Sequence, residues 1–103
     1  MFERVANCDE LWPGEMRRCL VRGDAVLLVN VEGTIVAYRD RCAHLGAPLS
    51  AGEFKADRIV CAVHRWEYDA RTGLGINPRS VALVPYAVQV RDGAIFVNTD
   101  LPP

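Results

Sequence analysis

Two short stretches of the sequence hold the side chains that could bind a metal centre. In the first, Cys42 and His44 are separated by one residue, and in the second, Cys61 and His64 are separated by two. Together they contain both histidines of the chain and two of its four cysteines. A cluster of two irons and two sulfides can be held by two cysteines on one iron and two histidines on the other. These four residues are therefore candidate cluster ligands.

The order of these residues favours a cluster over a zinc ion. Structural zinc sites usually join like residues, as Cys-x2-4-Cys and His-x3-5-His, whereas each stretch here joins a cysteine to a histidine. In a binuclear cluster, each loop can send its cysteine to an inner iron and its histidine to an outer iron near solvent. A structural Zn²⁺ site and a pair of hydrogen-bonded structural histidines are the alternatives.

The rest of the sequence has the pattern of short β-strands. Segments rich in valine and isoleucine are separated by turn residues, and Asp92-Gly93 between two of them is a strong hairpin signal. This pattern predicts an all-β fold, an antiparallel sandwich or small barrel. One helical turn is expected at 9–12, before the turn-forming pair Pro13-Gly14. Strands are expected at 2–6, 16–21, 25–31, 34–38, 58–61, 66–69, 81–84, 86–91 and 94–98.

We expect a single domain over residues 1–103, because a chain of this length has room for one core. Residues 39–80 break the strand rhythm and are expected to form an inserted cluster-binding subdomain of three loops. Two loops carry the candidate ligands, and the third, 72–78, is rich in glycine and ends in Pro78. We expect Gly46 to let backbone N–H groups approach the site and Pro78 to cover it from the third loop.

The composition argues against several functional classes. A formal net charge of −1 gives no overall attraction to nucleic acids or membrane surfaces. No apolar run is long enough to span a bilayer, and the first residues lack the layout of a signal peptide. A cytoplasmic location is expected, and Cys8 and Cys19 are interpreted as small buried apolar side chains, with a disulfide between them as the alternative. The sequence offers no nucleophile–base pair or nucleotide motif, so we expect no enzymatic activity of its own.

The segments C-A-H-L-G-A and C-A-V-H-R-W-E-Y resemble the two cluster-binding boxes of Rieske proteins. The run Trp12–Met16 and residues 72–78 are similar to the ferredoxin component of bacterial toluene-type, four-component di-iron monooxygenases. The resemblance implies a Rieske fold that holds one [2Fe–2S] cluster. It also implies that the cysteines of the two boxes bind the buried iron and that the histidines bind the exposed one.

The resemblance further implies a soluble, monomeric ferredoxin that carries single electrons. These would pass from an NADH-dependent flavin and iron–sulfur reductase to the hydroxylase of a di-iron monooxygenase acting on an aromatic or alkene substrate. Docking would be transient and bury less than about 1,200 Å². The ferredoxin of a Rieske ring-hydroxylating dioxygenase and the small Rieske subunit of a nitrite reductase are alternatives. A structural zinc-binding interaction module is a more distant one.

The sequence departs from the Rieske proteins of respiratory bc complexes at informative positions. Those proteins carry an extra, disulfide-forming cysteine in each box where Ala47 and Val63 stand here, and a serine in place of Trp66. Fewer hydrogen bonds to the sulfurs imply a potential in the lower half of the Rieske range of about −150 to +300 mV. Tyr68 matches a tyrosine whose hydroxyl lies near a ligand sulfur in the bc-type proteins, which would raise the potential. The alternative is a strand tyrosine with its hydroxyl in water.

The aromatic and basic residues near the boxes have two interpretations each. Trp66 is expected to be a core side chain or, beside His64, to shield the cluster or contact a partner, and Trp12 is expected in the core. Five arginines lie around the boxes in sequence and would steer an acidic partner if they ring the site in space. Otherwise they belong to a mixed, solvated surface. They are Arg39, Arg41, Arg65, Arg71 and Arg79.

Overall fold

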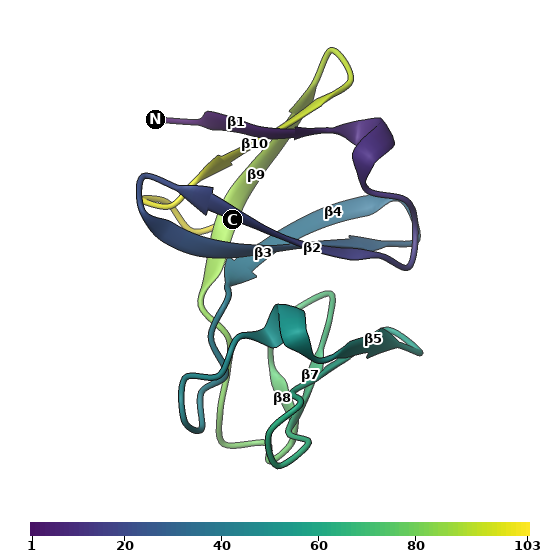
Figure 1. Ribbon diagram of the computed structural model, residues 1–103, viewed down its shortest axis with the longest axis vertical. Helices are drawn as coiled ribbons and strands as arrows, with labels where there is room; N and C mark the ends of the chain where they lie inside the picture. Colours follow the sequence, from purple (N-terminus) through teal and green to yellow (C-terminus); the bar gives the residue numbers. More distant parts are fainter.

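The computed structural model describes residues 1–103 and contains ten strands and two short 3-10 helices (Figure 1). The strands form two antiparallel sheets, in the orders β1-β10-β9-β4-β3-β2 and β5-β6-β7-β8, which confirms the all-β class. The larger sheet comprises β1 (Glu3–Asn7), β2 (Met16–Val21), β3 (Asp24–Val31), β4 (Thr34–Arg39), β9 (Pro85–Arg91) and β10 (Ala94–Asn98). The smaller sheet comprises β5 (Glu53–Lys55), β6 (Arg58–Val60), β7 (Glu67–Asp69) and β8 (Gly75–Asn77).

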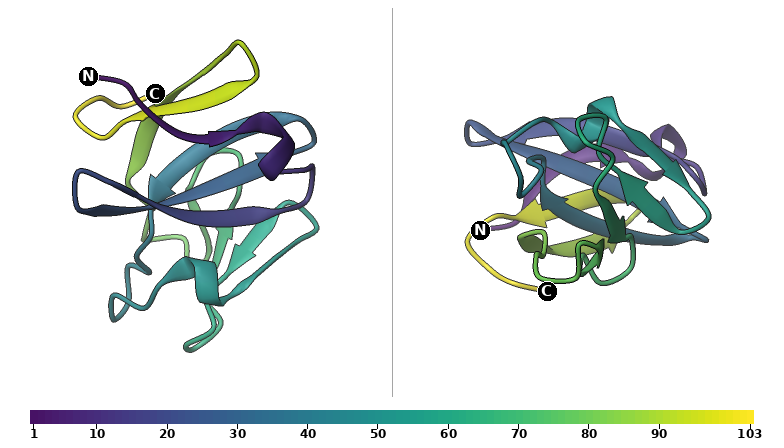
Figure 2. Two further views of the ribbon diagram at one scale, coloured as in Figure 1. Left: turned by 45° about the horizontal axis from the view of Figure 1, so that its top comes forward. Right: turned by 90° about the horizontal axis from the view of Figure 1, so that it is seen from below.

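Tight two-residue turns set the register of the hairpins. In four of them both central residues have positive φ, the geometry that matches the natural twist of paired strands. Three of the four place glycine second, because glycine adopts positive φ without a steric cost. The edge strands β1 and β2 also come into contact, so the larger sheet curls toward a barrel (Figure 2). The turns are Arg22-Gly23, Glu32-Gly33, Ala56-Asp57 and Asp92-Gly93.

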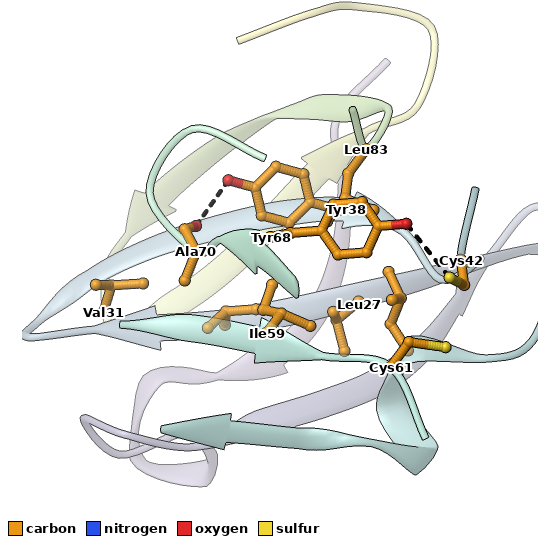
Figure 3. Close-up of a cluster of buried hydrophobic side chains, with 11 residues drawn as sticks. Leu27, Val31, Tyr38, Cys42, Ile59, Cys61, Tyr68, Ala70 and Leu83 are labelled. Carbon is orange, nitrogen blue, oxygen red and sulfur yellow. Dashed lines mark hydrogen bonds between the residues drawn. The ribbon is translucent and has the colours of Figure 1, made fainter. Parts of the chain in front are cut away.

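Strand β3 separates two hydrophobic cores, where the length of the chain led us to expect one. Successive side chains of a strand point to opposite faces, and nearly every residue of β3 is buried. Val26 and Leu28 pack into a core inside the curled sheet. Leu27 and Val29 pack into a second core between this sheet and the smaller one (Figure 3). The second core therefore fixes the smaller sheet against the scaffold.

The region 39–80 contains more regular structure than the sequence predicts. Strands β5 and β8 and the 3-10 helix η2 (Leu49–Ala51) occupy segments expected to be loops. Three-residue strands are too short to show an alternating pattern, and these depend on close backbone contacts. A Cβ atom on Gly52 would lie 2.0 Å from the Val60 carbonyl oxygen. Conversely, the strand expected at 81–84 is reduced to one bridge between Leu74 and Ala82.

The N-terminal connection also differs from expectation. The helical turn is the 3-10 helix η1 (Cys8–Glu10), and Leu11 takes the buried position after it, at 2% exposure. Trp12 is 64% exposed, so its assignment to the core is wrong. Cys8 and Cys19 are free thiols, half-buried against the core inside the curled sheet, and burial raises the pKa of Cys19 to about 11. The structure contains no helix that is long and apolar enough to cross a membrane.

Candidate metal centre

Three loops meet at one end of the molecule, drawn lowest in Figure 1 and seen from below in Figure 2. The first, 41–48, follows β4, and the second, 61–66, joins β6 to β7. The third is 78–84, which leads from β8 to β9; the segment expected as the third loop, 72–78, is mostly taken up by a turn and by β8, so its bounds were wrong. The first two loops are in contact through the imidazole rings of His44, in the first loop, and His64, in the second. A groove of about 170 Å³ beside His44 is lined by residues of the first and third. The topology thus gathers segments that lie far apart in sequence.

The two candidate cysteine ligands form a buried pair. Cys42 is 1% exposed and Cys61 is fully buried, and both belong to the core between the sheets (Figure 3). Burial raises the pKa of the Cys61 thiol; a hydrogen bond from the Val63 N–H opposes this shift, and the hydrogen-bonded Cys42 thiol adds to it. The two sulfurs therefore lie side by side in an environment closed to water.

The two candidate histidine ligands form an exposed pair. The ring centroids of His44 and His64 lie 4.6 Å apart, with 79° between the ring planes. The four candidate ligands therefore lie as two pairs, one of buried cysteines and one of exposed histidines, and no three His, Cys, Asp or Glu side chains gather around one point. This layering has sulfur inside and nitrogen outside.

Local backbone geometry places each histidine at the tip of its loop. His64 and Arg65 both have positive φ, at 61° and 55°, which costs a non-glycine residue roughly 1–3 kcal/mol. The Cys61 N–H donates to the Trp66 carbonyl oxygen at 2.8 Å and closes this strained turn. In the first loop, Cys42 and Ala47 are joined in the same way at 2.8 Å. Both histidines are therefore held on short, closed loops.

Gly46 is required by the first loop. Its φ is +76°, and a Cβ atom there would lie 2.9 Å from Nε of Arg41, whose guanidinium covers this position. Its N–H donates to the Cys42 carbonyl oxygen at 3.0 Å. Glycine thus gives the loop its left-handed turn and leaves room for the arginine.

A buried carboxylate closes the base of the first loop. Asp40 has a fully buried side chain and accepts hydrogen bonds from the Ser50 N–H at 2.9 Å and the Ser50 hydroxyl at 2.6 Å. Arg18 of β2 donates to it at 3.2 Å. Asp40 therefore ties the two ends of the loop to each other and to the scaffold. The sequence analysis missed both Asp40 and Ser50, because polar residues at the ends of an irregular segment have no distinguishing pattern.

The Tyr68 hydroxyl lies against the sulfur pair, not in water. Its oxygen is 3.3 Å from Sγ of Cys42 and accepts a hydrogen bond from the Ala43 N–H at 3.0 Å (Figure 3). The side chain is fully buried. Burial raises the pKa of Tyr68 well above its ordinary value, and the neighbouring Cys42 adds to the shift. Because the oxygen already accepts a hydrogen bond from the Ala43 N–H, the hydroxyl can donate its own proton to a hydrogen bond with the sulfur.

Trp66 contacts the exposed pair directly. Its ring is stacked on His44, with centroids 4.5 Å apart and 30° between the planes, and its other side packs against the core between the sheets. The side chain is therefore partly core, as one interpretation expects, and it also touches a candidate ligand; shielding of the cluster or contact with a partner stays a prediction. Pro78 lies half-buried at the start of the third loop, and its carbonyl oxygen packs on Gly75.

The five arginines do not form a single ring. Arg71 is engaged by Glu32 at 2.8 Å and by Asp57 at 3.6 Å, which removes it from the expected cluster. Arg39 and Arg41 line the groove beside His44, together with the apolar segment 82–84. Arg65 and Arg79 are exposed on the second and third loops. None of these last four forms an ion pair.

Comparisons with known proteins agree with this arrangement. Residues 2–92 match the model of the Rieske [2Fe-2S] domain family. The ferredoxin component of the alkene monooxygenase system of Xanthobacter autotrophicus (strain ATCC BAA-1158 / Py2) is 35% identical over 97 residues, which cover 93% of this chain and 80% of that protein.

Solved structures show the same fold. The ferredoxin of carbazole 1,9a-dioxygenase from Nocardioides aromaticivorans IC177 superimposes with a TM-score of 0.87 at 32% identity, covering 100% of this chain and 99% of that one. A chain in the complex of reduced oxygenase and oxidised ferredoxin in carbazole 1,9a-dioxygenase gives a TM-score of 0.86 at 28% identity, covering 93% and 91% of the two chains.

Removing the Tyr68 hydroxyl should lower the midpoint potential of the bound cluster. A hydrogen bond to a ligand sulfur stabilises the added electron, so Tyr68→Phe is expected to lower the potential by roughly 20–65 mV, the one-electron equivalent of about 0.5–1.5 kcal/mol. Protein-film voltammetry gives the value. Tyr38→Phe is the matched control, because the Tyr38 hydroxyl donates to the Ala70 carbonyl oxygen at 2.7 Å and contacts no sulfur. Equal shifts in the two variants would contradict the assignment.

Neutralising Asp40 should weaken the fold at the base of the first loop. Asp40→Asn keeps the shape but removes the charge that three donors share, and we expect the free energy of unfolding to fall by about 1–3 kcal/mol. Urea unfolding followed by circular dichroism measures this change. Asp92→Asn, in an exposed turn that accepts asparagine equally well, should change stability little. An Asp40→Asn variant with an unchanged free energy of unfolding would show that the carboxylate does not stabilise the base of the loop.

Proposed function

The chain belongs to the Rieske [2Fe-2S] family, and from this premise we propose that it is a ferredoxin in which Cys42 and Cys61 bind the inner iron and His44 and His64 the outer one. The observation that carries the proposal is the layered pairing of the four side chains. Two sulfurs lie side by side in the core, and two imidazoles lie in contact at the surface. A binuclear centre needs this supply, two protein ligands for each iron.

The donor set also fits the cofactor chemically. Thiolates and imidazoles are the ligands that Rieske clusters use. The buried cysteines have a Tyr68 hydroxyl and a Val63 N–H as hydrogen-bond donors beside them, which suits sulfurs that carry negative charge. A cluster is therefore favoured over the structural zinc ion and over paired structural histidines.

The protein supplies the environment in which a single electron is held and released. When bound, the cluster takes up and gives up one electron at a time. The core around Cys42 and Cys61 excludes water from the inner side. His44 and His64 reach the surface and offer a short path for the electron, and Trp66 stacks on the first of them. The chain therefore acts as a carrier and leaves substrate chemistry to a partner.

Two classes of oxygenase are candidate acceptors. A multicomponent monooxygenase is the first, supported by the similarity over 93% of this chain to an alkene monooxygenase ferredoxin component. A ring-hydroxylating dioxygenase is the second, supported by the close structural match to the ferredoxin of carbazole 1,9a-dioxygenase. The resemblance to the ferredoxin components of such oxygenases also implies an electron donor, an NADH-dependent flavin and iron–sulfur reductase. The carrier would work as a monomer in the cytoplasm, since a carrier that must leave its partner quickly needs only a small interface.

Electron transfer to a purified oxygenase tests the function. The reduced protein is mixed with the oxygenase component of the Xanthobacter alkene monooxygenase or of the Nocardioides carbazole 1,9a-dioxygenase, and its reoxidation is followed by stopped-flow absorbance. We expect reoxidation to be faster with the alkene monooxygenase component. A faster reaction with the carbazole component would assign the protein to the dioxygenase class, and no reaction with either would contradict the proposal.

Replacing an outer ligand tests the site. His64→Ala should abolish the normal visible and EPR spectra of the reduced cluster, because one iron loses a protein ligand. Arg65→Ala is the matched control, since Arg65 lies in the same strained turn and is exposed. A His64→Ala variant with an unchanged spectrum would show that the ligand set is wrong.

A further inference from the structure

Charge is distributed unevenly between the cluster end and the rest of the molecule. The three loops at the cluster end, 41–48, 61–66 and 78–84, contain Arg41, Arg65 and Arg79 and no acidic residue. All 13 Asp and Glu residues lie elsewhere, so the remainder of the chain is net negative although the whole carries a formal charge of only −1. The molecule is therefore polarised, with its positive end at the paired histidines.

These three arginines are free to meet a partner. Each is exposed and none forms an ion pair. Six of the other basic residues are engaged by carboxylates within the molecule: Arg17, Arg18, Arg22, Lys55, Arg58 and Arg71.

The acidic residues that flank the loops do not cancel this charge. Asp40, just before the first loop, has a buried side chain held by Ser50 and Arg18. Glu67, just after the second loop, is paired with Arg58 at 2.9 Å. The carboxylates that flank these loops in sequence thus leave the positive charge of the loops uncompensated.

We propose that this end docks on an acidic surface of the electron-accepting oxygenase, with Arg41, Arg65 and Arg79 as the charges that steer and orient the encounter. The inference rests on the proposed function, because it concerns the surface through which the electron leaves. Opposite charges on the two faces raise the association rate and suppress wrong orientations. A symmetric dimer through this surface is disfavoured, since two such faces repel each other.

The surface between the arginines suits a small, transient contact. Leu45 is 69% exposed and Val63 is 38% exposed, each next to a candidate histidine ligand. The same loops thus expose both apolar side chains and unpaired cations, the two kinds of residue that an interface combines. The added electron contributes one negative charge, which three arginines outweigh.

The sign of the electrostatic potential at the cluster end can be measured with two small oxidants of opposite charge. The reduced protein is oxidised by ferricyanide, an anion, or by tris(1,10-phenanthroline)cobalt(III), a cation, at increasing concentrations of sodium chloride. Since salt screens exposed charges, we expect the ferricyanide rate to fall and the cobalt rate to rise, although the molecule as a whole is net negative. The opposite pair of trends would overturn the proposal.

Charge reversal tests which residues are responsible. The double variant Arg65→Glu/Arg79→Glu should slow ferricyanide oxidation at low salt by about tenfold and slow association with the accepting oxygenase similarly. The double variant Arg4→Glu/Arg91→Glu is the matched control, because it makes the same change in net charge on β1 and β9, away from the loops. Visible spectra and midpoint potentials of both variants should show an intact cluster. Equal rates for the two double variants would contradict the role of this surface.

Two further outcomes separate the hypotheses. Transfer to the oxygenase that is independent of salt and of both double variants would overturn the docking inference and leave the electron-carrier function standing. Binding of the wild-type protein to phosphatidylserine vesicles, stronger than to the oxygenase and lost in Arg65→Glu/Arg79→Glu, would instead assign the surface to a membrane and overturn the docking inference as well.

Discussion

The burial of two cysteine sulfurs side by side is the constraint on which the rest of the structure depends. Cys42 and Cys61 come from different loops and meet in the core between the two sheets, packed with Leu27 of β3 and Tyr68 of β7. Because the cysteines occupy the side that faces the core, the histidines lie on the side that faces solvent. Three features hold the two loop tips over this buried pair. They are the backbone hydrogen bonds that close each loop, the left-handed turn at Gly46, and the hydrogen bonds of Asp40 at the base of the first loop.

The polar groups near the two cysteines are of two kinds: some contact the sulfurs, and others contact only the base of the first loop. The Tyr68 hydroxyl and the Val63 N–H approach the sulfurs, whereas Asp40 contacts only backbone and side chains at the base of the loop. In bc-type proteins a disulfide joins the two loops; Ala47 and Val63 stand at those positions here. The contacts of Asp40 with Ser50 and Arg18 and the stacking of Trp66 on His44 are noncovalent contacts in the same region.

The fold class could be predicted from the sequence, and the candidate ligands could be proposed from it, because both depend on local signals. Two-residue turns with glycine mark the hairpins of the larger sheet, and mixed Cys and His boxes are specific to their chemistry. The sequence does not predict β5 and β8, which exist through tertiary contacts such as the approach of Gly52 to Val60. The contacts of the Tyr68 hydroxyl and of Arg71 likewise involve residues distant in sequence. The sequence therefore allowed two interpretations of each of these residues.

The central claim is that both histidines of the chain bind one iron of a [2Fe–2S] cluster. Because the chain contains only His44 and His64, labelling histidine with nitrogen-15 marks these two side chains and no others. Pulsed EPR of the reduced, labelled protein measures the coupling of each imidazole nitrogen to the unpaired electron. The account predicts strong couplings from two inequivalent histidine nitrogens. A spectrum with one such coupling, or with none, would contradict it.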